Sequence, residues 1–170
     1  IKSPNHHQCE KEIKQAIEWA RPTKTRLIIN DYWELALRHG AHGVHLGQDD
    51  LYPEALNALE KAGILLGIST HNLSEIARAT GEQPSYIALG TLFHTTTKTM
   101  DFPPLGLSSF RWLRGLVHHP MIAIGGIHLS QAKEVYDAGA DGIAVISEIR
   151  DSQDPGQTMR EWEMIQPEET

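Results

Sequence analysis

Six short apolar segments recur along the chain, and none shows the polar alternation that is typical of a half-exposed strand. They lie at residues 26–30, 43–46, 65–69, 86–90, 121–126 and 142–147. Continuous apolar runs of this length are typical of strands that are buried on both faces, as in a parallel sheet covered by helices. We therefore expect six buried strands.

Helical patterns separate these segments, for example at residues 32–39, 53–62, 72–80, 107–118 and 129–138. Strands and helices that alternate in this way predict a parallel α/β fold. The phrase GAHGVHL at 40–46 resembles GADGIAV at 139–145, and each has a Gly that can end a helix before the next strand. Repeated units favour a closed barrel, although an ordinary helix-to-strand loop uses glycine in the same way.

Composition narrows the class of protein. The 170 residues are 40% hydrophobic and contain no run of eighteen apolar positions, so we expect one domain over residues 1–170 and no membrane span. The single cysteine, Cys9, cannot form an internal disulfide, and the opening residues lack the order of a secretory signal, which favours the cytoplasm. With 22 acidic and 15 basic side chains, the surface does not favour nucleic acid or anionic lipid. A phosphate group must therefore bind at a local site rather than to a broadly cationic surface.

Two segments near the end of the chain suit such a phosphate site. Gly125 and Gly126 follow an apolar strand, where they let backbone N–H groups approach an anion, and Ile146 and Ser147 follow the next strand. In (βα)₈ barrels, phosphate sites often lie in the loops after strands seven and eight. An ordinary tight turn is the alternative for the glycine pair.

If these are strands seven and eight, the segment at 26–30 is the third strand of a TIM-type (βα)₈ barrel. The first strand, the first helix and most of the second strand are then missing, and Ile1 and Lys2 are the second strand's last residues. Such a barrel has two exposed edges, which favour pairing with another chain, a homo-oligomer, or a missing N-terminal segment.

Two carboxylates follow neighbouring strands and predict a metal site. Asp31 comes directly after the segment at 26–30, with Asn30 beside it, and Asp50 follows the segment at 43–46. Two carboxylates at one rim suit Mg²⁺, which takes one or two protein carboxylates and completes its shell with water and substrate phosphate. Each Asp has an alternative role as a helix N-cap.

Hydroxyl and ammonium groups gather in one further loop. Thr95, Thr96, Thr97 and Lys98 follow the segment at 86–90 and can donate hydrogen bonds to phosphate, or simply form an exposed polar loop. Ser69 ends another strand, where an ST-turn or a helix N-cap is the alternative. The adjacent histidine pairs at 6–7 and 118–119 lack the spacing of a helical zinc site.

Taken in order, these motifs resemble the thiamine-phosphate synthase family over nearly the whole chain. The matching segments are LIIND, GVHLGQDD, GISTH, YIALGTLF followed by TTTK, IAIGGI and AVIS. The resemblance implies a transferase of thiamine biosynthesis with small-molecule substrates: hydroxymethylpyrimidine pyrophosphate loses pyrophosphate, and the ring nitrogen of thiazole phosphate captures the resulting cation.

The resemblance also implies a role for each matching residue. Asp31 and Asp50 would hold Mg²⁺, while Asn30, Ser69 and Lys98 would bind the pyrophosphate and stabilise it as it leaves. The remaining implied contacts are Lys2 near the pyrophosphate, Thr95, Thr96 and Thr97 at the thiazole phosphate, and Gly126, Ile146 and Ser147 at the same phosphate through the backbone.

The chain departs from the family pattern at two places. Of the family's Gln-x-Arg-x-Lys stretch only Lys2 remains. His94 stands where the family usually has a proline, directly before the loop of Thr95, Thr96, Thr97 and Lys98, which we call the threonine loop. Two alternatives therefore stay open: a relative of the thiazole tautomerase, and a non-catalytic, phosphate-binding remnant of the barrel. Asp31, Asp50 and Lys98 favour the synthase over the tautomerase, which does not need a metal and pyrophosphate site.

Overall fold

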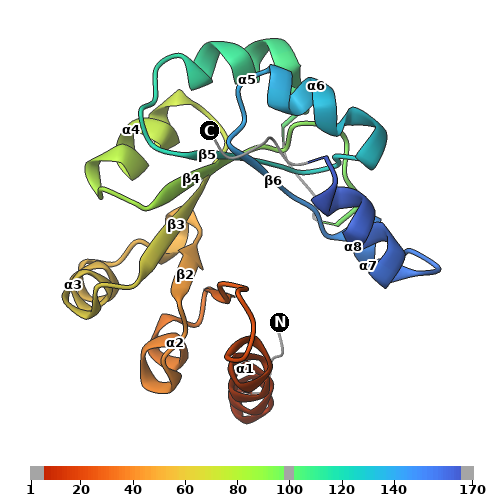
Figure 1. Ribbon diagram of the computed structural model, residues 1–170. Helices are drawn as coiled ribbons and strands as arrows, with labels where there is room; N and C mark the ends of the chain where they lie inside the picture. Colours follow the sequence, from red (N-terminus) through yellow and green to blue (C-terminus); the bar gives the residue numbers. More distant parts are fainter. Residues whose placement is uncertain (1–5, 98–101, 166–170) are drawn as a thin grey trace. The chain divides into compact units, whose positions relative to one another are not determined.

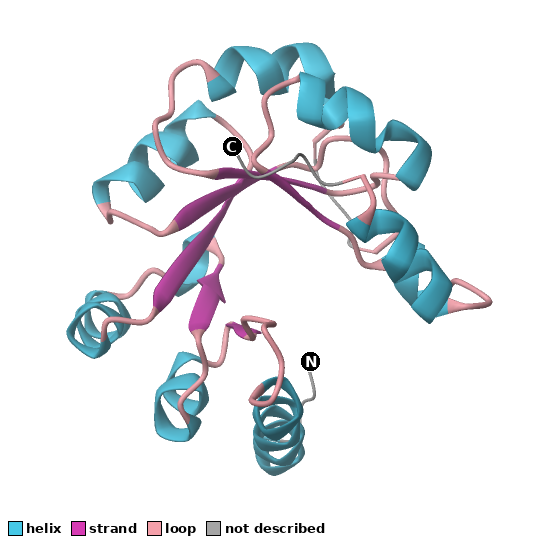
Figure 2. Cartoon of the chain, in the orientation of Figure 1, coloured by secondary structure: helices cyan, strands magenta, loops and turns pink. Residues whose placement is uncertain are grey.

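The computed structural model describes residues 6–97 and 102–165, and the chain divides into two compact units (Figure 1). The first unit comprises Ile1–Ser69 and Gly81–Ser85, and the second comprises Thr70–Thr80 and Tyr86–Thr170. Helices and strands alternate along both units, as Figure 2 shows. The expected α/β class is therefore confirmed.

In the first unit, three parallel strands pair in chain order. They are β1 (Ile28–Asn30), β2 (Gly43–Leu46) and β3 (Leu65–Thr70), whose last residue belongs to the second unit. The register places Asn30 beside His45 and Leu46 beside Ile68. The helical elements of this unit are α1 (His6–Ala20), α2 (Trp33–His39), η1 (Gln48–Asp50) and α3 (Pro53–Ala62).

The second unit repeats this pattern with β4 (Tyr86–Leu89), β5 (Met121–Ile124) and β6 (Gly142–Ala144), again parallel and in chain order. The helical elements are α4 (Leu73–Gly81), α5 (Gly106–Arg114), η2 (Leu129–Gln131), α6 (Ala132–Asp137), α7 (Ser147–Arg150) and α8 (Pro155–Glu163). The register aligns Leu89 with Ala123 and Ile124 with Ala144. The carboxyl ends of these strands, which lead into the polar loops, therefore lie at the same end of the sheet.

Apolar side chains from strands and helices form the core of each unit, because burying them is the main favourable contribution to folding. The first unit buries Ile13, Leu35, Val44, Leu46, Leu59 and Ile68. The second unit buries Ile87, Leu89, Phe110, Met121, Ala123 and Val135. All six expected strands are present, which confirms the inference from unbroken apolar runs.

The C-terminal ends of two helices explain why the segments at 40–46 and 139–145 each begin with glycine. Gly40 follows α2 with φ of 71°, and its N–H donates to the carbonyl oxygens of Ala36 and Leu37. Gly139 follows α6 with φ of 99°, and its N–H donates to the Tyr136 carbonyl oxygen. Both glycines thus follow a helix in the left-handed conformation, and in each case the next strand begins three residues later.

The sequence did not identify α1. Its buried side chains Cys9, Ile13 and Ile17 recur every four residues and face α2, against which α1 packs. Glu10 joins the two helices by accepting hydrogen bonds from Arg38 Nη1 at 3.1 Å and from His39 Nε2 at 2.9 Å. The hydrogen bond from His39, followed by that from Arg38, lowers the pKa of the Glu10 carboxyl.

The described residues contain six strands, three in each unit, and a closed eight-stranded barrel is not confirmed. None of the helices in the described part of the chain is long and apolar enough to cross a membrane.

Candidate active site

Six polar residues lie at or just after the carboxyl ends of the three strands of the first unit, and we call them the first-unit cluster: Asn30, Asp31, His45, Gln48, Asp50 and Ser69. The Asp31 N–H donates to the His45 carbonyl oxygen at 2.9 Å, which extends the β1–β2 ladder by one residue. His45 Nε2 lies 2.7 Å from Ser69 Oγ, and Gln48 Nε2 donates to the Ser69 carbonyl oxygen at 2.8 Å. Four of the six residues are therefore linked directly by hydrogen bonds.

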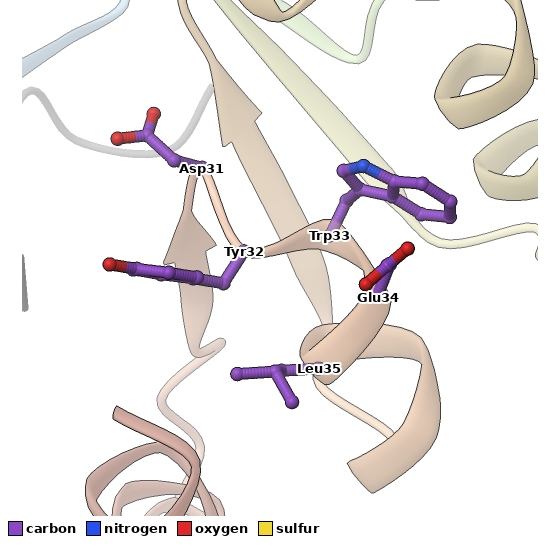
Figure 3. Close-up of a pocket in the computed structure, with 5 residues that line it drawn as sticks. All are labelled: Asp31, Tyr32, Trp33, Glu34 and Leu35. Atoms are coloured by element: carbon purple, nitrogen blue, oxygen red, sulfur yellow. The ribbon is translucent and has the colours of Figure 1, made fainter. Parts of the chain in front are cut away.

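Asp31 adopts a left-handed backbone conformation, with φ of 67°, which Asp tolerates better than most residues. The helix after it begins at Trp33, and its N-cap residue is Tyr32, whose side chain makes no capping hydrogen bond. Figure 3 shows the Asp31 carboxylate pointing away from the first turn of α2. The N-cap alternative for Asp31 is therefore wrong, and its carboxylate can serve another role.

A pocket of about 280 Å³ lies beside Asp31 and is lined by consecutive residues (Figure 3). They are Asp31, Tyr32, Trp33, Glu34 and Leu35. A Cys9 hydrogen bond is the largest influence on the Tyr32 phenol and raises its pKa, and burial and the charge of Asp31 act in the same direction. The lining of the pocket therefore includes two carboxylates, those of Asp31 and Glu34, and the Tyr32 phenol.

Asp50 ends the turn η1 and is half-buried, whereas its neighbour Asp49 is exposed. A Cβ atom at Gly47 would lie 3.2 Å from Asp50 Oδ2, so the glycine leaves room for this carboxylate. The next helix, α3, has Tyr52 as its N-cap residue, without a capping side-chain hydrogen bond. Neither aspartate therefore caps α3, and this alternative is also wrong.

His45 holds the centre of the first-unit cluster. Burial lowers the pKa of its imidazole, and the nearby charge of Asp31 opposes this shift without reversing it. A neutral imidazole can donate from Nε2 to Ser69 Oγ, which leaves the Ser69 hydroxyl hydrogen available to a ligand.

Ser69 does not cap the helix that follows it. Asn72 does so instead, because its Oδ1 accepts from the Glu75 N–H at 3.0 Å. Glu75 in turn accepts from His71 Nδ1 at 2.8 Å. The alternative role of Ser69 as an N-cap is therefore wrong.

Gln48 has one buried oxygen, Oε1, that finds no hydrogen-bond partner among the described residues. An unpaired buried acceptor is costly, so such an atom marks a place where a donor can bind. No role was predicted for His45 or Gln48 from the sequence, although both lie in the GVHLGQDD segment. The signal that could have found them is position: His45 is the β2 residue beside Asn30, and Gln48 begins the turn that ends at Asp50.

In the second unit, the glycine pair after β5 is overlaid by the loop after β4. Gly125 and Gly126 have φ of 90° and 68°, and a Cβ atom at Gly126 would lie 2.2 Å from the His94 carbonyl oxygen. The Phe93 N–H donates to the Gly125 carbonyl oxygen at 3.0 Å. The structure therefore brings the start of the threonine loop to the glycine pair, and a side chain would not fit between them.

The threonine loop itself is described as far as Thr97. Thr95 is half-buried, and Thr96 and Thr97 are exposed. The Thr97 N–H donates to Thr95 Oγ1 at 3.2 Å, an ST-turn that orders the loop locally. Lys2 and Lys98 lie outside the described residues, so their expected roles stay predictions.

Ile146 and Ser147 follow β6, as expected. Ile146 is 59% exposed, and Ser147 begins the four-residue helix α7. The next residue, Glu148, accepts from the Leu129 N–H at 3.0 Å and lies 2.7 Å from His128 Nδ1. The segment after β6 is therefore tied to the loop after β5, which holds Gly126.

Within residues 6–97 and 102–165, no group of three or more His, Cys, Asp or Glu side chains gathers as a metal site. A Mg²⁺ site does not need three protein side chains, because Mg²⁺ can bind to one or two carboxylates and take its remaining ligands from water and phosphate. Asp31 and Asp50 supply oxygen ligands of the type that Mg²⁺ prefers.

The chain matches a family model described as thiamine monophosphate synthase over residues 1–149. It belongs to this family. A thiamine-phosphate synthase of Photorhabdus laumondii is 47% identical over 155 residues, which are 91% of this chain and 72% of the relative. The synthase of Serratia proteamaculans is also 47% identical, over 91% of this chain and 73% of its own length. A transferase of thiamine biosynthesis, expected from the motifs, is thus confirmed.

Solved structures agree with this assignment. A thiamine phosphate pyrophosphorylase from Pyrococcus furiosus has a TM-score of 0.85 and 28% identity, over 97% of this chain and 79% of its own. A protein of the same description from Bacteroides thetaiotaomicron has a TM-score of 0.65 at 14% identity, which is a likeness of fold alone. The thiamine monophosphate synthase family therefore accounts for both the sequence and the parallel α/β fold.

Proposed function

We propose that this chain joins hydroxymethylpyrimidine pyrophosphate to thiazole phosphate, giving thiamine phosphate and pyrophosphate. The observation that carries the proposal is the first-unit cluster, in which two aspartates follow neighbouring strands and neither caps a helix. Carboxylates that follow neighbouring parallel strands and cap no helix are suited to metal and phosphate chemistry. Membership of the thiamine monophosphate synthase family supports the choice of substrates.

The departure of pyrophosphate is the step that the first-unit cluster would assist. The bond between the pyrimidine methylene carbon and the pyrophosphate oxygen breaks, and both electrons remain on that oxygen. Mg²⁺ held by Asp31 and Asp50 would supply positive charge to the leaving group. Asn30 and the Ser69 hydroxyl, which His45 orients at 2.7 Å, would donate hydrogen bonds to it as its charge grows. Lys98 and Lys2 are proposed to contribute ammonium groups.

The capture step needs a second, separate set of groups. The lone pair of the thiazole ring nitrogen forms the new C–N bond with the pyrimidine methylene cation, and no proton transfer is required. Binding the phosphate of this substrate in a fixed place orients the nitrogen. We assign that phosphate to the backbone at Gly126, Ile146 and Ser147 and to the hydroxyls of the threonine loop, Thr95, Thr96 and Thr97.

The six strands are proposed to be strands three to eight of a (βα)₈ barrel. The Pyrococcus furiosus structure supports this, because the chain matches it at a TM-score of 0.85 while covering 79% of its length. The glycine pair and Ser147 then follow strands seven and eight, where such barrels commonly bind phosphate.

Pyrophosphate release from the purified chain, with both substrates and Mg²⁺, tests the proposed reaction. We expect Asp50→Ala to lower turnover at least about 100-fold, because the metal would lose one of two carboxylates. Asp49→Ala is the matched control: this neighbour is exposed, and its loss should change turnover less than about threefold.

Each result has a definite meaning. Equal turnover in the wild-type chain and Asp50→Ala would remove Asp50 from the metal site. Binding of both substrates without pyrophosphate release would replace the transferase with a non-catalytic phosphate-binding protein, whereas release that does not depend on Mg²⁺ would contradict the two-carboxylate site.

A further inference from the structure

One carboxylate in the second unit joins two loops that belong to different strands. Glu148 is the second residue of α7, after β6, and its Oε1 accepts from the Leu129 N–H at 3.0 Å. Its Oε2 lies 2.7 Å from His128 Nδ1. Leu129 and His128 are in the loop after β5, so a single side chain holds the two loops together.

The two halves of this contact differ in strength. Glu148 is only 21% exposed, whereas His128 is 65% exposed, so water screens the ion pair and weakens it. The bond to Leu129 involves a partly buried backbone N–H at the start of η2, a position where helical N–H groups lack partners within their own helix. A carboxylate that accepts from such an N–H forms a strong, charge-assisted bond. The hydrogen bond from the Leu129 N–H to Glu148 is therefore the contact that fixes the two loops relative to each other.

The position of this bond relates it to the phosphate site. Leu129 comes three residues after Gly126, and Glu148 directly follows Ser147. These are the backbone segments to which the proposed function assigns the thiazole phosphate, and that phosphate has to meet both at once. We propose that Glu148 is a positioning residue, which sets the distance between the two segments without touching the substrate; the inference rests on the proposed function.

This role predicts a specific response, because geometry and charge can be changed separately. Glu148→Gln removes the charge but keeps an oxygen that can accept from the Leu129 N–H. Glu148→Asp keeps the charge but shortens the side chain and withdraws it from that N–H. Glu148→Ala removes both. If Glu148 acts by position, the Gln variant should resemble the wild-type chain, and the Asp and Ala variants should not.

Steady-state kinetics with each substrate varied in turn measures the effect. We expect Glu148→Ala and Glu148→Asp to raise KM for thiazole phosphate about tenfold, because a phosphate site displaced by a fraction of an ångström loses affinity. Glu148→Gln should stay within about threefold, and kcat and KM for the pyrimidine substrate should change less than about twofold in all three. Asp137→Ala is the matched control, since Asp137 is an exposed carboxylate that pairs with Lys133 on α6.

Calorimetric binding of thiazole phosphate alone separates this inference from the proposed reaction. Tenfold weaker binding by Glu148→Asp, with no pyrophosphate release by the wild-type chain, would support the positioning role and overturn the reaction. Equal binding by the wild-type, Asp and Gln variants would overturn the positioning role. Tighter binding by Glu148→Gln and Glu148→Ala than by the wild-type chain would also overturn the positioning role, because it would mean that the Glu148 charge repels the phosphate. The absence of any binding by the wild-type chain would overturn it as well. If Glu148→Ala does not fold, the Asp and Gln pair decides.

Discussion

His45, on β2, interacts with side chains at the ends of both neighbouring strands: the charge of Asp31 acts on its imidazole, and its Nε2 lies 2.7 Å from Ser69 Oγ. Its imidazole lies between Asp31, whose charge favours protonation, and a buried environment that disfavours it. Burial is the larger influence, so the pKa of His45 falls below its ordinary value of 6.5. A neutral ring is the form that can orient the Ser69 hydroxyl as a donor.

The lowered pKa of His45 gives stability a definite pH dependence. Between the folded pKa and 6.5 the unfolded chain binds more protons than the folded chain, so the free energy of unfolding falls as pH decreases through this range. His45→Gln cannot titrate and keeps a side-chain donor for Ser69. We therefore expect a smaller loss of stability from about pH 7 to about pH 5 in this variant than in the wild-type chain.

Urea unfolding at several pH values measures this difference. All other titrating groups are shared by the two proteins, so the difference between their curves isolates His45. Parallel curves would show that the imidazole has the same pKa in the folded and unfolded chains, and the assignment of a neutral His45 would fail.

How well the sequence predicts a single residue depends on whether its role is local. Asp31 and Asp50 could be predicted because Asp31 directly follows an apolar run and Asp50 lies four residues after the end of the next one. His45 and Gln48 were missed, since their contacts with Ser69 exist only once β2 pairs between β1 and β3. Glu148 was missed for the same reason: its partner Leu129 is distant in sequence.

At the scale of elements, the loop after β5 depends on the absence of side chains. Gly126 has φ of 68°, and a Cβ atom there would lie 2.2 Å from the His94 carbonyl oxygen. Gly63, after α3, has a similar φ of 64° but nothing within 4 Å of the same atom. The two positions therefore share the backbone strain of an alanine substitution and differ in the clash.

Comparison of Gly126→Ala with Gly63→Ala separates these two costs. We expect Gly63→Ala to lower the free energy of unfolding by about 1 kcal/mol, from left-handed backbone strain alone. Gly126→Ala should lower it by about 2–4 kcal/mol, because the threonine loop must also move, and it should raise KM for thiazole phosphate. Chemical denaturation and kinetics measure both. Equal stability losses would mean that the loop after β4 yields without cost, and close packing would not define this site.

Elements were predicted well where an unbroken apolar run marked a strand. The β2 segment agrees with its expected bounds, as does α3, which begins at Pro53 and ends before Gly63. The helix expected at 107–118 ends at Arg114, and the one expected at 129–138 divides into η2 and α6. The missed helices α1, α7 and α8 are either polar on average or only four residues long, so tertiary packing rather than pattern defines them.

At the scale of the whole molecule, the residues proposed for the two substrates belong to different compact units. The carboxylates are in the first unit, and the glycine pair with Ser147 is in the second. The expectation of one domain over residues 1–170 stays a prediction, because compactness within each unit does not establish independent folding.

This division predicts how ligands change thermal stability. A ligand that binds only the folded chain at about 100 times its Kd stabilises it by about 2.7 kcal/mol, which raises Tm by roughly 5–10 °C for a chain of this size. We expect Mg²⁺ with pyrophosphate to produce such a rise in the wild-type chain and in Glu148→Ala, but not in Asp50→Ala. Thiazole phosphate should do the reverse: it should stabilise Asp50→Ala, whose second unit is unchanged, as much as the wild-type chain. It should stabilise Glu148→Ala by only about 1.4 kcal/mol at the same concentration, because tenfold weaker binding leaves the ligand at about 10 times its Kd.

Melting curves of the three proteins with each ligand form a crossed comparison in which each variant is the control for the other. A loss of both ligand responses in Asp50→Ala would mean that the carboxylate supports the whole fold rather than a metal site. Undiminished responses to both ligands in both variants would place the ligands elsewhere in the chain. The crossed pattern alone requires two phosphate sites, one dependent on the carboxylates of the first unit and one on the loops of the second.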